Sequence, residues 1–208
     1  MIELTDSISD IKLKINKAFA QDINSLLKRR AKSIERQCKA LVSEWVSSQP
    51  EMVSLTSGLP ASLAGQFGLI PGSELYAIKD ITSSVESSVQ VRLQQFDSKL
   101  NGGLYVYFQP SDFVNLLGLS SGHTFYKDGD LHWMDWLLNQ GDRIIVVNYS
   151  YNPQLGIGRS RLGNMVESGS FRVPPQFSGT PDDNFITRAL IGRNQESEIS
   201  RIFTKELS

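Results

Sequence analysis

Residues 7–49 read SISDIKLKINKAFAQDINSLLKRRAKSIERQCKALVSEWVSSQ, and this stretch decides the fold of the chain. Its apolar residues recur mostly three or four positions apart, as they do on one face of an α-helix. They are Ile8, Ile11, Ile15, Phe19, Ile23, Leu26, Leu27, Ile34, Cys38, Leu41, Val42 and Trp45. Ser7 or Ser9 is suited to cap the first turn, and Pro50 stops the helix. The pattern therefore predicts one long amphipathic helix.

A helix of about 40 residues is ~60 Å long, which is more than a compact domain of 208 residues can cover. Two arrangements follow. Either the helix breaks into two antiparallel pieces, or part of its apolar stripe contacts another subunit. No glycine or proline interrupts residues 7–49, so we favour the contact with another subunit.

Positive charge is concentrated in the same helix. Residues 11–40 contain nine Lys and Arg against Asp22 and Glu35, whereas the whole chain carries a net charge of −1. Such an uneven distribution favours partners with complementary faces, including other copies of the chain. The candidate contacts with DNA or with an acidic partner are Lys28, Arg29, Arg30, Lys32, Arg36 and Lys39. A solvated helix face explains these residues equally well.

The rest of the chain mixes helix and strand signals. Alternating residues predict a strand at 89–94, and Asn101-Gly102-Gly103 predicts a hairpin that joins it to 104–108. The other expected elements are short helices at 59–67, 111–117 and 131–139, strands at 143–149 and 170–173, a Gly-rich loop at 152–169, and a helical region at 184–207 kinked at Gly192.

These elements predict the α+β class: a long N-terminal helix, a central antiparallel β-sheet with a long Gly-rich loop, and a C-terminal helix. We expect one domain over residues 1–208. It comprises a helical arm (1–50), the sheet and loops (51–180) and the C-terminal helix (181–208). No apolar run approaches the roughly 20 residues that a membrane span needs, so we expect no membrane partner.

One motif suggests an enzyme. Gly118-Leu-Ser120-Ser-Gly122 matches G-x-S-x-G, but a nucleophile elbow needs a strand before the serine and a helix after it. Here the helical pattern comes first and a loop follows. We therefore expect no catalysis, and a small serine hydrolase using Ser120 is the least favoured alternative.

Two other patterns suggest ligands. His123, Asp128, Asp130, His132 and Asp135 lie within 13 residues, but without the spacing of a known metal motif. The loop from Gly156 to Gly163 carries Arg161 where a dinucleotide fingerprint needs its third glycine. We therefore expect neither a metal nor a cofactor.

Several residues in the second half are candidates for a subunit interface. Trp133 and Trp136 lie three apart on a short helix, which places them against the core or against a neighbouring subunit. Arg159 and Arg161 belong to the Gly-rich loop and can bind a phosphate or a carboxylate of a neighbouring subunit. We favour a flexible loop that orders at a subunit contact.

Four quoted segments of this half resemble one family. They are residues 133–146 (WMDWLLNQGDRIIV), 158–163 (GRSRLG), 171–180 (FRVPPQFSGT) and 183–189 (DNFITRA). They look like the C-terminal half of the tail-completion, or head–tail joining, proteins in the neck of tailed bacteriophages. The resemblance covers roughly residues 130–207 and extends to the earlier residues only in the order of elements.

The resemblance implies a structural virion protein rather than an enzyme. It implies a ring, commonly a hexamer, assembled in the host cytoplasm. That ring lies between the portal-side connector and the tail terminator or tail tube, and genomic DNA passes non-specifically through its lumen. Pro174, Pro175 and Phe177, in the third matching segment, join the candidate interface residues. The alternative is a nucleic-acid-associated helical module that uses the basic helix.

Overall fold

The computed structural model describes residues 7–110, 112–127, 129–156 and 158–208 of the chain. The helices are α1 (Ile8–Ser47), α2 (Pro50–Thr56), α3 (Leu63–Gln66), α4 (Ser73–Ser88), α5 (Val114–Leu117), the 3-10 helix η1 (Ser120–Gly122), α6 (Trp133–Leu138), α7 (Phe185–Leu190) and α8 (Arg193–Leu207). The strands are β1 (Gln90–Gln94), β2 (Gly103–Tyr107), β3 (Thr124–Tyr126), β4 (Gly129–Leu131), β5 (Val146–Val147), β6 (Ser150–Asn152), β7 (Asn164–Val166) and β8 (Ser170–Phe171).

The predicted α+β class and the long N-terminal helix are confirmed. Helix α1 runs without a break through 40 residues. Ser7 caps it by accepting a hydrogen bond from the backbone N–H of Asp10, whose carboxylate in turn accepts from the Ser7 N–H. Pro50 does not end α1 directly, because α1 stops at Ser47 and Pro50 begins α2 at a position that needs no N–H donor.

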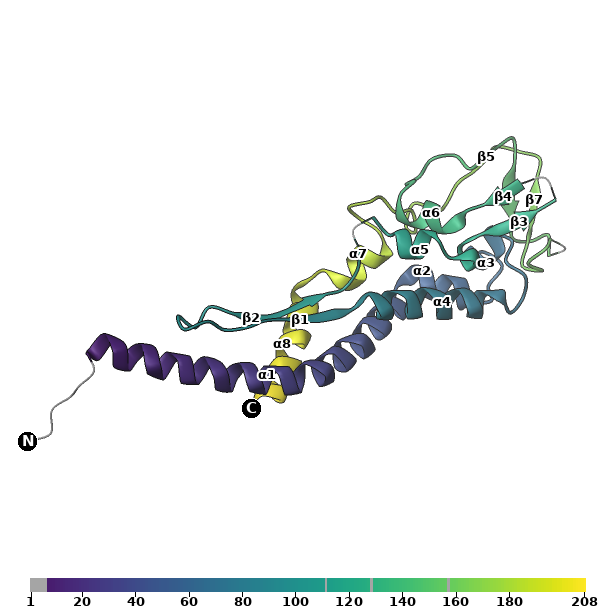
Figure 1. The fold of residues 1–208 in the computed structure, drawn as a ribbon. Coiled ribbons are helices and arrows are strands. Elements are labelled where there is room, and N and C mark those ends of the chain that lie inside the picture. Colours follow the sequence, from purple (N-terminus) through teal and green to yellow (C-terminus); the bar gives the residue numbers. More distant parts are fainter. Residues whose placement is uncertain (1–6, 111, 128, 157) are drawn as a thin grey trace, which may run out of the picture.

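Figure 1 shows an elongated molecule. Most short helices and strands form a body at one end, and α1 extends from it toward the N-terminus. The β1–β2 hairpin lies along the middle of α1. Helix α4 packs against α1 nearer the body, and the C-terminal helix α8 also packs against α1. The N-terminal turns of α1 continue past the tip of the hairpin.

The predicted hairpin is confirmed, with Gln90 opposite Tyr107 and Gln94 opposite Gly103. Its tip is fixed to α1 by Asn24. The Asn24 side chain accepts a hydrogen bond from the Phe96 N–H at 2.7 Å and donates one to the Phe96 carbonyl at 3.0 Å. This pair of bonds lies close to Ala20, the first buried residue of α1.

Helix α4 was not predicted. It begins after Gly72, which has a left-handed φ of 93°, and it buries Ala77, Ile81 and Val85 at spacings of four. Six serine and threonine residues interrupt this apolar pattern, and such residues weaken a helix signal because they compete with the backbone for hydrogen bonds. Local propensity alone does not predict this helix, and contact with α1 stabilises it.

Among the described residues, the β-structure is divided into four two-stranded antiparallel sheets rather than gathered into one central sheet. The strand predicted at 143–149 is reduced to β5, because Asn148 turns the chain with φ = 64° and the pairing partner β8 has only two residues. The loop predicted at 152–169 contains most of the β6–β7 hairpin. The body therefore contains short two-stranded sheets, where a longer sheet was expected.

The C-terminal helices follow the prediction, with Gly192 between α7 and α8. Helix α8 returns along α1. Trp45 donates from its indole nitrogen to Glu198 at 3.0 Å, and Gln37 donates to Glu206 at 2.6 Å. The main hydrophobic core lies in the body and along the C-terminal half of α1, where Ile34, Cys38, Val42 and Val46 are fully buried.

Candidate assembly surface

The first three turns of α1 carry large apolar side chains that the described residues leave exposed. Residues 8–19 are called the projecting segment below. Ile8 is 75% exposed, Ile15 48% and Phe19 56%. Ile8, Ile11, Ile15 and Phe19 follow one another at spacings of three, four and four, so they form one stripe on the helix. A contiguous exposed apolar stripe of this kind marks an interaction surface.

Leu13 extends a second stripe, the one that faces the core. Leu13, Ala20, Leu27 and Ile34 recur every seven residues, and the last three are buried whereas Leu13 is half exposed. The hairpin is hydrogen-bonded to α1 at Asn24, and Leu13 lies eleven residues before that point. The projecting segment therefore presents apolar atoms on two nearly opposite sides, because Leu13 lies about 160° around the helix from Ile11 and Ile15.

The six basic residues predicted to contact DNA or an acidic partner divide into two groups. Arg30 lies 3.8 Å from Glu206, and Lys39 pairs with Glu35 at 2.7 Å. The hydrogen bond and charge of Lys39 lower the pKa of Glu35. The other four are exposed and form no salt bridge within the described part of the chain; we call them the basic face: Lys28, Arg29, Lys32 and Arg36.

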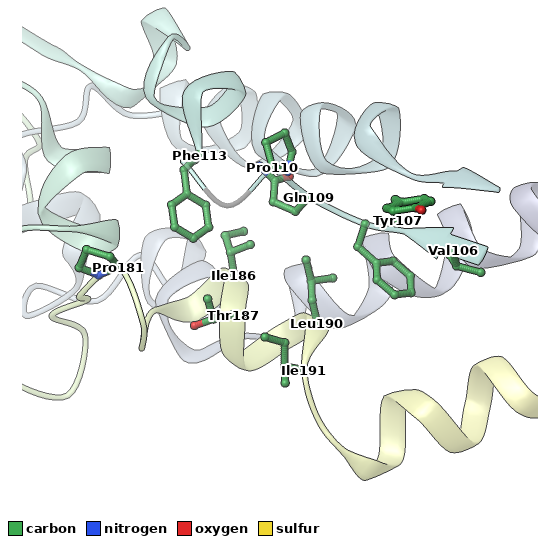
Figure 2. A pocket seen from close by; sticks show the side chains of 11 residues that line it. Val106, Tyr107, Gln109, Pro110, Phe113, Pro181, Ile186, Thr187, Leu190 and Ile191 are labelled. Carbon is green, nitrogen blue, oxygen red and sulfur yellow. The ribbon is translucent and has the colours of Figure 1, made fainter. Parts of the chain in front are cut away.

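An apolar groove of about 360 Å³ lies between the end of β2, the loop that follows it, and α7 (Figure 2). Phe113, Ile186 and Leu190 are its buried members, and Tyr107 and Ile191 are exposed at its edge. Ile191 is 74% exposed. Sequence reasoning missed this groove, because its walls come from segments about 80 residues apart.

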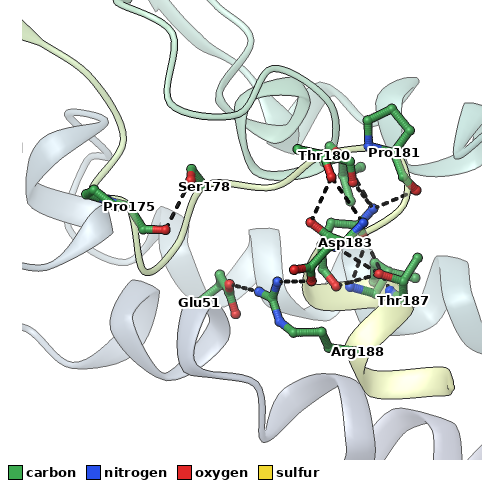
Figure 3. A network of polar contacts seen from close by, with 11 residues as sticks. Glu51, Pro175, Ser178, Thr180, Pro181, Asp183, Thr187 and Arg188 are labelled. Carbon is green, nitrogen blue, oxygen red and sulfur yellow. Dashed lines mark hydrogen bonds and ion pairs between the residues drawn. The ribbon is translucent and has the colours of Figure 1, made fainter. Parts of the chain in front are cut away.

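One side of the groove is held in place by a polar network (Figure 3). Arg188 of α7 pairs with Asp183 at 2.7 Å and also with Glu51 of α2, whose side chain is completely buried. Burial raises the pKa of Glu51, and the charge of Arg188 opposes that rise. Asn184 caps α7 by accepting from the N–H groups of Ile186 and Thr187. These contacts fix α7 against α2.

The sequence left Trp133 against the core or against a subunit interface, and the structure places it in the core. Its side chain is 0% exposed and stacks on Phe67 with ring centroids 5.5 Å apart, so it belongs to the core of the protomer. Trp136 and Phe177 are half-buried against the same core. Of the two prolines, Pro174 is half-buried and Pro175 is exposed.

The described residues of the Gly-rich loop contact the rest of the chain, and ordering of the loop at a subunit contact stays a prediction. Arg159 donates to the Phe125 carbonyl and lies over the Tyr126 ring at 5.4 Å. Tyr151, at the start of the loop, donates to the Pro60 carbonyl at 2.6 Å. Arg161 is exposed, with a left-handed φ of 59°.

Ser120 does not sit on a nucleophile elbow. It follows α5 and begins η1, which leads into β3, so the strand comes after the serine rather than before it. Nearby, His123 Nδ1 lies 2.7 Å from Asp130 Oδ2, and the His123 ring stacks on His132 at 3.9 Å. Burial and the charge of His123 lower the pKa of His132.

The structure does not assemble the metal site that the sequence pattern suggested. Asp128 lies outside the described residues. Across the described ranges, no three His, Cys, Asp or Glu side chains are grouped so that they could hold a metal ion. Cys38 is buried, and burial raises the pKa of its thiol to about 11.

The most prominent unpartnered features of the described chain are thus the projecting segment, the basic face and the groove. None of the described helices has the length and apolar character needed to cross a membrane. No protein-family model matches the chain, and no significant similarity to a curated protein or a solved structure was found.

Proposed function

We propose that this chain is a structural subunit that assembles with copies of itself into a closed ring. The projecting segment carries this proposal, because a continuous helix holds Ile8, Ile15 and Phe19 beyond any cover that residues 7–208, as far as the structure describes them, supply. Burying such side chains is worth about 1.5–3 kcal/mol each. Self-association is a direct way to gain that free energy.

The resemblance to head–tail joining proteins supplies the biological setting of the proposal. The ring belongs to the neck of a tailed-phage virion, joins the head connector to the tail and lets DNA pass. The elongated shape and the separation of positive charge from the rest of the chain support such head-to-tail packing. The basic face is then placed toward the DNA lumen or toward an acidic neighbour.

A nucleic-acid-associated module is the second candidate, and the basic face favours it. Four cations on exposed helix turns bind phosphates without sequence preference. If they bind DNA, log K falls with log salt with a slope of about −3 to −4. Substituting Lys28 and Lys32 by Gln would reduce that slope by about 2.

The proposal is tested by light scattering over a concentration series, followed by electron microscopy of the largest species. We expect a plateau at a multiple of 23.2 kDa and ring-shaped particles with a central opening. A mass of one chain at every concentration contradicts assembly of the chain by itself.

A further inference from the structure

Two apolar surfaces of the chain are complementary in form and have no partner among the residues that the structure describes. One is the convex helical stripe of the projecting segment, and the other is the concave groove between β2 and α7. We propose that the projecting segment of one copy lies in the groove of a neighbouring copy. This contact rests on the proposed self-assembly and names the surfaces that produce it.

The two surfaces cannot meet within one chain. Glu198, in the helix that follows the groove, is hydrogen-bonded to Trp45. Phe19 lies 26 residues before Trp45 in the same unbroken helix, which places these two residues about 40 Å apart. Only a second copy can bring the stripe to the groove.

The shapes match the way in which amphipathic helices bind grooves. Such a helix inserts apolar anchors that recur at spacings of three and four, and Ile8, Ile11, Ile15 and Phe19 have these spacings. The groove is open and mostly apolar. Figure 2 shows Leu190 and Ile191 on one side of it and Val106 and Tyr107 on the other.

The charges also match. The projecting segment contains the exposed Lys12 and Lys17 and the carboxylate of Asp10. Asp112 and Asp182 are exposed directly beside the groove residues Phe113 and Pro181. Close to the groove Arg188 is already paired with Asp183 and Glu51. A positive segment therefore meets a rim with negative charge, which orients the helix and excludes like-charged partners.

The contact is heterologous, because the stripe and the groove are different surfaces of the same chain. A heterologous contact leaves one free stripe and one free groove after every addition, so it ends only when a ring closes. This property separates the proposal from a symmetric pairing of two stripes, which stops at a dimer.

Two single substitutions test the contact from its two sides. Phe19→Asp places a charge on the stripe and Ile191→Asp places one at the groove edge. Both positions are exposed, so folding is preserved and circular dichroism checks this. Leu75→Asp, at a residue 63% exposed on α4 and outside both surfaces, is the matched control. We expect each test variant to have the mass of one chain, and the control to assemble like the natural chain.

Mixing the two variants gives the decisive result. Phe19→Asp keeps an intact groove and Ile191→Asp keeps an intact stripe, so an equimolar mixture forms one contact and stops at a dimer of twice 23.2 kDa. A mixture that stays monomeric overturns the proposal, as does an Ile191→Asp variant that still assembles. In the second case the ring itself stands and only the contact is wrong.

A cysteine pair gives an independent test. With Phe19→Cys and Ile191→Cys in one chain, mild oxidation is expected to link successive copies and to produce a ladder on a denaturing gel. Cys38 is buried and does not compete. The absence of any ladder, with either single-cysteine variant as the control, contradicts the contact. A natural chain that is monomeric throughout, together with a double-cysteine variant that gives no ladder, overturns both the contact and the proposed ring.

Discussion

The two ends of α1 have the same kind of sequence and different surroundings. Near the C-terminal end, Ile34, Cys38, Val42 and Val46 are fully buried among α4, α7 and α8. Near the N-terminal end, Ile8 and Phe19 recur at helical spacing and remain exposed. An amphipathic pattern therefore shows which face of a helix is to be buried, but not whether the same chain or another molecule buries it.

The same substitution at both ends of α1 tests whether the two ends really differ in burial. Ile34→Ala removes a side chain that is 0% exposed, and we expect it to lower the free energy of unfolding by about 3–4 kcal/mol. Ile15→Ala, at a residue 48% exposed, is expected to change it by less than about 0.5 kcal/mol. Urea denaturation at low protein concentration, where the chain is monomeric, measures both. Equal losses at the two positions would show that the chain itself covers the N-terminal turns.

The buried end is further tested at Arg188. Arg188→Ala leaves Glu51 buried without its partner, and we expect a loss of about 2 kcal/mol, because Arg188 itself is partly exposed and part of its effect is screened by solvent. Glu51→Gln combined with Arg188→Ala is the control, and it is expected to restore most of the loss. An equal loss in the double variant would assign the effect to packing rather than to the uncompensated carboxylate.

Asn24 marks the boundary between the covered and projecting parts of α1. Asn24→Ala removes both hydrogen bonds to the Phe96 backbone, and we expect a loss of about 1 kcal/mol. Hydrogen exchange at the Phe96 amide is expected to accelerate, while exchange in the buried half of α1 is unchanged. Unaltered protection of Phe96 would mean that the hairpin is held to α1 by its apolar contacts alone.

The smallest expected effect is the change in the free energy of unfolding with pH that arises from His132, in the body. The folded chain lowers the pKa of His132 from its ordinary value of 6.5, so folding favours the neutral ring. The stabilisation is complete above about pH 6.5 and declines as the pH falls below it. His123, Asp130 and Asp135 face the same group. We expect His132→Gln to show a smaller loss of unfolding free energy between pH 7.5 and 5.5 than the natural chain. An identical pH dependence would exclude His132 as its source.

Local sequence signals predicted much of the fold. The helix α1, the hairpin β1–β2 and the break at Gly192 each follow from spacing, turn residues or a cap within a short window. Helix α4 and the division into four sheets depend on contacts between distant segments. Such contacts override propensity and cannot be read from one window.

The candidate site shows the same limit. The exposed stripe of α1 was anticipated, because its length exceeded what the chain could cover. The groove was not, since Phe113 and Leu190 are brought together only by the folded chain. Trp133 shows the same limit, because its spacing allowed either the core or an interface and only the folded chain shows that it lies in the core.

The central claim is that the projecting segment assembles copies of the chain. The most direct measurement is the molar mass of the natural chain and of Ile15→Asp over the same concentration series. We predict that the natural chain reaches a plateau well above 23.2 kDa, whereas the variant, equally stable, stays at the mass of one chain. Indistinguishable masses for the two proteins would contradict the account.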